Sequence, residues 1–150
     1  MTSKITEPLP EERYGYHDTS YRAAGEFAGI QALVKCFYEF MNTLPEARGI
    51  RSMHSNDLSD IDSKLTHFLC YWLGGPRRFV EKHGPVSIPA AHRHLAIGSR
   101  ERDAWLLCMQ KAIALQPYRV SFKQYLLEQL AVPAERIRVV CEPNMPAPDK

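Results

Sequence analysis

The stretch of sequence that decides the fold reads Phe68-Leu69-Cys70-Tyr71-Trp72-Leu73-Gly74-Gly75-Pro76. It ends a pattern of apolar residues at helical spacing that starts at Leu58 and continues through Ile61 and Leu65. Polar residues at 55–57 precede the pattern as candidate helix caps, and the glycines followed by proline predict its end. The dense apolar run is far shorter than the roughly 20 residues that a helix needs to span a bilayer.

Three further segments repeat the helical pattern. The first covers residues 27–41 and is expected to end near Leu44, because a proline disfavours helix in the residue before it. The second covers residues 105–113, with Ser99 as a candidate cap, and the third is a shorter helix around residues 122–130. No stretch alternates apolar and polar residues with β-branched enrichment. The sequence therefore predicts an all-α fold.

The connection over residues 77–98 is too long to be a simple turn, and long connections in compact domains are usually functional. It contains three of the six histidines, His83, His92 and His94. By contrast, residues 1–20 are polar and show no interpretable pattern. The proline-containing residues after Ala131 are expected to be frayed or loosely docked.

Length and composition limit the class of protein. The chain has 150 residues, of which 45% are hydrophobic and 24% charged, so one globular domain is expected. The net charge of +2 gives no electrostatic case for nucleic-acid binding. The N-terminus has no apolar signal segment, so we expect a cytoplasmic protein. The four cysteines show no CxxC spacing and are interpreted as reduced, buried thiols.

Common catalytic motifs are missing from the sequence. His92 and His94 form an i, i+2 pair, but a zinc site needs three or four ligands and no other spacing supplies them. No GxSxG motif and no glycine-rich phosphate loop occur. What remains is an imidazole on an irregular segment before an apolar helix that starts with Trp105. Such a histidine is most often a plain surface or core residue, whereas an aromatic-rich helical interior can also hold haem on one histidine.

Several segments in register resemble the group II, or O-type, truncated haemoglobins of bacteria. Residues 68–76 resemble the end of the distal helix and the turn after it, and residues 33–38 resemble the helix with the distal tyrosine. Ile97 followed by residues 101–109 resembles the group II signature. The resemblance implies a two-over-two helical sandwich, a shortened globin fold, with haem b between the helices. It divides the chain into an N-terminal extension (1–23), a truncated globin domain (24–130) and a C-terminal tail (131–150).

The resemblance also implies roles for single residues. His92 matches the proximal iron ligand, and its second ring nitrogen is expected to bond a backbone carbonyl of residues 86–91. Tyr38, His54 and Trp105 match ligand-binding positions on the distal side, where each can donate a hydrogen bond. The other residues expected to contact the haem are Ile61, Lys64, Leu65, Phe68, Phe79, Leu95 and Ile97. Ala91 and Phe79 depart from the family, which often has a basic residue and a tyrosine there, and this bears on the propionate contacts.

Each polar residue of this set also has a plain structural interpretation. Trp105 could be a core residue, and Tyr38 could anchor its helix with the hydroxyl at the surface. His54 could simply flank a helix cap. Lys64 could form an i, i+4 surface pair with Asp60.

The function that the resemblance implies is binding of O2, and of CO or NO, at a pentacoordinate haem with a polar distal cage. Redox chemistry on reactive oxygen or nitrogen species, peroxidase-like or nitric oxide dioxygenase-like, is a further expectation and would need a reductase partner. The alternatives are a haem-based sensor or electron-transfer partner without turnover, and a haem-free helical interaction module. Neither nucleic acid nor a membrane is expected as a partner, and both monomer and homodimer stay open.

Overall fold

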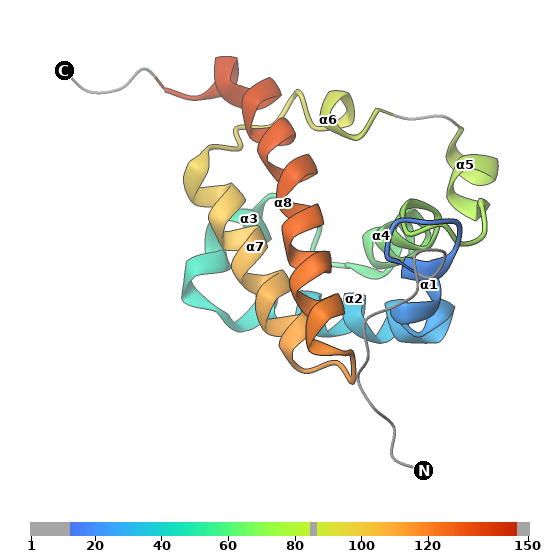
Figure 1. Ribbon diagram of the computed structural model, residues 1–150. Helices are drawn as coiled ribbons and strands as arrows, with labels where there is room; N and C mark the ends of the chain where they lie inside the picture. Colours follow the sequence, from blue (N-terminus) through green and yellow to red (C-terminus); the bar gives the residue numbers. More distant parts are fainter. Residues whose placement is uncertain (1–12, 85–86, 147–150) are drawn as a thin grey trace, which may run out of the picture.

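The computed structural model describes residues 13–84 and 87–146, and over these residues the chain is helical and contains no strand (Figure 1). No helix in this part of the chain is long and apolar enough to cross a membrane. Two short 3-10 turns, η2 (Pro45–Ala47) and η3 (Glu142–Asn144), follow α2 and α8. The α-helices are α1 (Thr19–Ala23), α2 (Glu26–Thr43), α3 (Arg48–Ser52), α4 (Ser59–Trp72), α5 (Arg78–His83), α6 (Ile88–Ala91), α7 (Ser99–Ala114) and α8 (Val120–Cys141).

Helix α2 is central to the fold, because it packs against both α4 and α7. Helices α7 and α8 lie side by side as a second pair (Figure 1). The pair α2–α4 thus meets the pair α7–α8 through the contact of α2 with α7, which confirms the expected two-over-two sandwich. Burial of each large apolar side chain between the pairs contributes roughly 1.5–3 kcal/mol. The fully buried apolar residues include Ile30, Leu33, Val34, Phe37, Cys108, Met109, Ala112 and Leu126.

Proline and glycine end two helices where the sequence predicts. Helix α2 ends directly before Pro45, and Leu44 has an extended backbone with ψ 129°. After α4, Gly74 has φ +94°, the left-handed region that favours glycine. A Cβ at Gly74 would lie 1.9 Å from the carbonyl oxygen of His17, so this turn has no room for a side chain.

The chain before α2 packs on the turn that follows α4. The N–H of Tyr21 donates to the carbonyl oxygen of Leu73 at 3.0 Å. A Cβ on Gly75 would lie 2.4 Å from Cδ1 of the Tyr21 ring, which shows that the ring covers this glycine closely. Thr19 and Ser20 of α1 are buried. The described part of the expected N-terminal extension is therefore packed against the domain, and its boundary at residue 23 stays a prediction.

Helix α8 is much longer than the sequence predicts. The apolar pattern indicated residues 122–130 followed by a frayed segment, but the helix runs from Val120 to Cys141 with Pro133 inside it. The expectation of fraying is therefore wrong for residues 131–141. A proline removes one helical hydrogen bond. Ala134 and Cys141 beyond it are buried, and tertiary packing of this kind outweighs local propensity.

The start of α7 also differs from the expectation. Ser99 is the first helical residue and not the cap, because Gly98 occupies the N-cap position. The N–H of Gly98 donates to Oε1 of Glu101 at 2.8 Å. The carboxylate of Glu101 therefore accepts the hydrogen bond at the start of the helix, where negative charge favours the helix dipole.

Two guanidinium groups share the carboxylate of Glu135 at the contact between α7 and α8. Nη2 of Arg138 lies 2.7 Å from Oε2 of Glu135, and Nη1 of Arg102 lies 2.7 Å from Oε1. Hydrogen bonds from Arg138 and from Arg102 lower the pKa of Glu135 from 4.5 to about 2. Because Arg102 belongs to α7, the cluster ties the second half of α8 to that helix.

We expect Glu135→Gln to make folding stability less dependent on pH in acid. The folded pKa of Glu135 is depressed, so its ionised form stabilises the fold above pH 4.5, and this contribution is lost as the pH falls towards 2. Urea unfolding at several pH values should show the wild type more stable than the variant near pH 6, with the difference shrinking in acid. Glu128→Gln, at an exposed position of α8, is the matched control. An unchanged difference at pH 2 and pH 6 would contradict the prediction.

Candidate functional site

One ring nitrogen of His92 is bonded to the backbone, which leaves the other available to a different partner. His92 follows α6, and its Nδ1 lies 2.7 Å from the carbonyl oxygen of Ile88. A carbonyl oxygen can only accept, so Nδ1 carries the hydrogen, and in the neutral ring Nε2 keeps a free lone pair. Ile88 falls within residues 86–91, where the acceptor was expected. An imidazole held in this way has the tautomer that a metal ligand needs.

His54 shows the same local geometry at the end of α3. Its Nδ1 lies 2.8 Å from the carbonyl oxygen of Ile50, and the ring is half-buried. The neutral ring therefore has no N–H left to offer to a ligand, and its Nε2 can only accept. The expected donor role of His54 is thus limited to its protonated form.

Tyr38 of α2 lies next to His54 in the interior. Their ring centroids are 6.1 Å apart in an edge-to-face arrangement, and only 6% of Tyr38 is exposed. Tyr38 is therefore not a helix anchor with its hydroxyl at the surface. Burial, and to a smaller extent the charge of Asp62, raises the pKa of its hydroxyl, which stays protonated and available as a donor.

Trp105 of α7 is connected to Tyr38 through the ring of Phe37, which contacts both. The rings of Phe37 and Trp105 are 5.2 Å apart, and those of Phe37 and Tyr38 are 4.9 Å apart, both edge-to-face. Phe37 is fully buried, whereas Trp105 is half-buried. The structure therefore brings Tyr38 and Trp105 against one buried phenylalanine, which the sequence showed only as part of an apolar pattern, and places His54 beside Tyr38.

Helix α4 carries apolar side chains on more than one face. Leu69 and Cys70 are buried in the core. Ile61, Leu65 and Phe68, spaced four and three residues apart, are half-buried and pack at its edge. This second face can pack against a flat apolar group.

Phe79 extends this face beyond the end of α4. It is buried, and its ring centroid lies 5.4 Å from that of Phe68. The ring of Trp72 also stacks on the ring of Phe68, with the two ring centroids 6.3 Å apart. Phe68 is therefore fixed by two aromatic contacts.

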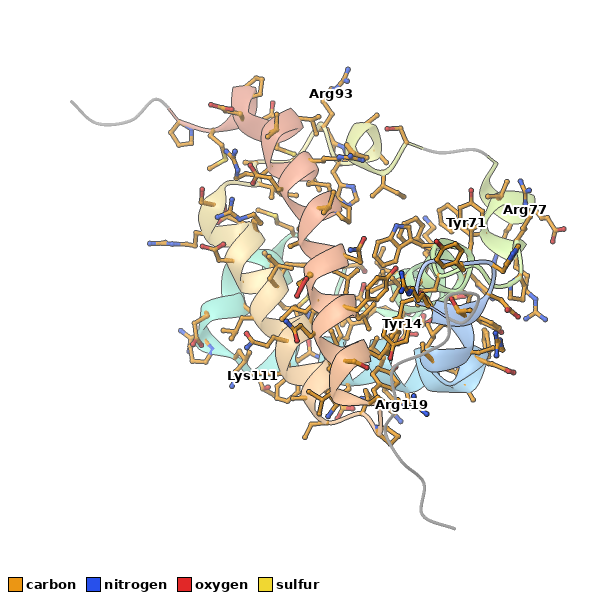
Figure 2. The ribbon with its side chains drawn as sticks, viewed as in Figure 1. Tyr14, Tyr71, Arg77, Arg93, Lys111 and Arg119 are labelled. Carbon is orange, nitrogen blue, oxygen red and sulfur yellow. The ribbon has the colours of Figure 1, made fainter. Side chains whose placement is uncertain are left out.

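The segment around His92 is held by other elements. Helix α6 packs against α8, whereas α4 packs against α2 and α5, so His92 and the second face of α4 are positioned independently (Figure 1). Leu95 and Ile97 are half-buried after His92, while His94 is exposed. Arg93 projects outward beside α6 (Figure 2). The side chain of His83 lies outside the described residues.

Lys64 forms the surface pair with Asp60 that the sequence offered as its plain structural interpretation. Its Nζ lies 3.7 Å from Oδ2 of Asp60, one helical turn away, and both side chains are exposed. Among the residues that the structure describes, no three His, Cys, Asp or Glu side chains gather as a metal site.

Comparison with known proteins gives one consistent family. Residues 19–137 match the model of the family described as bacterial-like globin. The group 2 truncated hemoglobin YjbI of Bacillus subtilis is 30% identical over 117 residues, which cover 78% of this chain and 86% of that protein.

Solved structures agree with the sequence comparison. The group II 2-on-2 hemoglobin of Agrobacterium tumefaciens superimposes with a TM-score of 0.77 at 33% identity, covering 90% of this chain and 98% of that one. A cold-adapted truncated hemoglobin of Pseudoalteromonas haloplanktis gives a TM-score of 0.76 at 31% identity, covering 79% and 95%. The truncated oxygen-avid haemoglobin of Bacillus subtilis gives 0.72 at 29% identity, covering 79% and 97%.

We expect His54 and His92 to share one ring tautomer at neutral pH. Ring-nitrogen NMR of the full chain labelled with 15N should show Nδ1 protonated and Nε2 unprotonated in both, because each Nδ1 donates to a carbonyl. The exposed His94 serves as the control and should show no single tautomer. An unprotonated Nδ1 in His92 would contradict the geometry of its ring.

Proposed function

The chain belongs to the bacterial-like globin family, and from that premise we propose that it is a group II truncated haemoglobin that binds O2 at a haem b. The observation that carries the proposal is the hydrogen bond from Nδ1 of His92 to the carbonyl of Ile88, which leaves Nε2 free. Of the six histidines, His92 also matches the family position of the iron ligand. Bound haem supplies an iron that takes up diatomic gases reversibly, with CO and NO as further ligands.

The residues around His92 and α4 fit a haem. Ile61, Leu65 and Phe68 would cover one face of the haem with apolar side chains, and Phe79 would pack against the ring of Phe68. Ile61 has no atom that could coordinate iron, which supports a pentacoordinate resting state. Trp105, Leu95 and Ile97 would complete the contacts, and Lys64 could turn from Asp60 to a propionate.

Two donors would hold O2 in this protein. The rings of Tyr38 and Trp105 both pack edge-to-face against Phe37, and the hydroxyl of Tyr38 and the indole N–H of Trp105 are both donors at neutral pH. Nε2 of neutral His54 can only accept, so His54 would pack beside the ring of Tyr38 and leave the hydroxyl hydrogen of Tyr38 to the ligand. Preorganised donors in an apolar interior stabilise an electron-rich ligand without reorganisation. Such a cage favours slow release of O2 over bulk transport.

Catalytic turnover of the bound O2 would extend this proposal. A tightly held O2 could react with nitric oxide or related species, in a dioxygenase-like or peroxidase-like reaction. The residues Tyr38 and His54 would then orient the ligand and supply a proton, and a reductase would return the protein to its starting state. Binding without turnover, in a sensor or an electron-transfer partner, would use the same site.

His92→Ala should abolish iron coordination by the protein. The measurement is the absorption spectrum of the ferric, ferrous and ferrous-CO forms, together with the haem content after purification. His94→Ala is the matched control, since this exposed histidine lies only two residues away. If His92→Ala retains the wild-type spectra, the ligand assignment is wrong.

Tyr38→Phe and Trp105→Phe should each accelerate O2 dissociation. A hydrogen bond to a charged group contributes about 1.5–3 kcal/mol, so its loss should raise the rate roughly tenfold or more. Stopped-flow displacement of O2 measures the rate directly. Tyr71→Phe, which changes an exposed tyrosine at the end of α4, should leave the rate unchanged. Unchanged rates in both distal variants would reject the two-donor cage.

A further inference from the structure

The last residue of α8 contacts the backbone of His92. Cys141 is fully buried, and its Sγ lies 3.0 Å from the carbonyl oxygen of His92. The thiol is the donor, because a carbonyl oxygen only accepts. The two residues are 49 positions apart, so this contact is a feature of the tertiary fold and not of local structure.

Two more residues after α8 continue this contact along the chain. Nδ2 of Asn144 lies 2.8 Å from the carbonyl oxygen of Leu95 and also donates to the carbonyl of Arg93. A Cβ on Gly98 would lie 2.7 Å from Cε of Met145, which shows that the methionine covers that glycine. Residues 141–145, here named the proximal clamp, thus contact the segment 92–98 from its first residue to its last.

The clamp itself is fixed to the body of the protein. Arg102 of α7 bonds Glu135, which lies less than two turns before Cys141 on α8. Helix α6, which carries the carbonyl of Ile88, also packs against α8. Both contacts of His92 therefore depend on α8. The ring bonds Ile88 of α6, which packs against α8, and the backbone carbonyl bonds Cys141 of α8 itself.

We propose that the proximal clamp positions the imidazole of His92, with Cys141 and Asn144 as its positioning residues. The inference rests on the proposed function, because it concerns the orientation of Nε2 towards iron. The bond to Ile88 fixes the ring at Nδ1, and the backbone bonds of His92 with Pro89 and Leu95 are equally local, so these contacts leave the segment as a whole free to shift relative to the end of α8. The clamp removes that freedom by holding the carbonyls of residues 92, 93 and 95.

Four variants separate positioning from plain packing. Cys141→Ala removes the donor, and Cys141→Ser keeps one as a hydroxyl. Asn144→Ala removes the second contact at an exposed position, so it tests the clamp even if Cys141→Ala folds poorly. Cys108→Ala deletes an equally buried thiol from α7 and serves as the control for loss of packing.

The first measurement is hydrogen exchange of the full chain as purified, followed in peptides that cover residues 88–98. Cys141→Ala and Asn144→Ala should exchange roughly fivefold faster there, the factor that corresponds to a lost hydrogen bond of about 1 kcal/mol. Cys141→Ser should restore slow exchange. Cys108→Ala should leave these peptides unchanged, although it lowers the overall stability.

The second measurement is resonance Raman of the ferrous protein, which reports the iron–imidazole stretching band. The band should shift and broaden in Cys141→Ala and Asn144→Ala, return in Cys141→Ser, and stay in place in Cys108→Ala. A wild-type band that none of the clamp variants moves would overturn the clamp and leave the proposed function intact. No iron–imidazole band in the wild type would overturn both, whatever the exchange rates show.

Discussion

The proposed site depends on one hydrogen bond from an imidazole to the backbone. By donating from Nδ1 to the carbonyl of Ile88, the ring of His92 fixes its tautomer and presents a bare nitrogen on the opposite edge. His54 repeats the device with Ile50, and the same rule there turns an expected donor into an acceptor. Two rings with the same tautomer are thus given different proposed roles by their surroundings, because His92 lies after α6 and His54 lies beside Tyr38.

The two-over-two arrangement places these groups on rigid helices. Helix α2 carries Phe37 and Tyr38 through the middle of the core, and α7 brings Trp105 against Phe37. The half-buried face of α4 is built at the same time, because Leu69 and Cys70 of the same helix pack into the core. Donors and apolar wall are therefore positioned by the same packing that stabilises the fold, which gives a site little freedom to reorganise.

The sequence predicts much of this from local rules. Pro45 ends α2 and Gly74 ends α4 because backbone sterics act within a few residues. The acceptor for His92 was expected among the backbone carbonyls of residues 86–91, because an imidazole that binds iron through one nitrogen needs an acceptor for its second ring N–H. Long-range contacts were beyond such rules: α8 continues through Pro133 because of tertiary burial, and Cys141 reaches His92 across 49 positions. The tautomer of His54 depends on the carbonyl of Ile50, four residues earlier, a contact as local as that of His92 with Ile88.

Gly74 links two parts of the chain in a way that restricts how the sequence can drift. Its left-handed backbone and the carbonyl of His17 at 1.9 Å from a would-be Cβ leave no alternative residue at this turn. The segment that contains His17 packs on this turn only because position 74 has no side chain, and its Tyr21 N–H donates to the carbonyl of Leu73 in the same turn. A chain without that segment would lose the steric constraint from His17, whereas the left-handed backbone would still favour glycine at position 74.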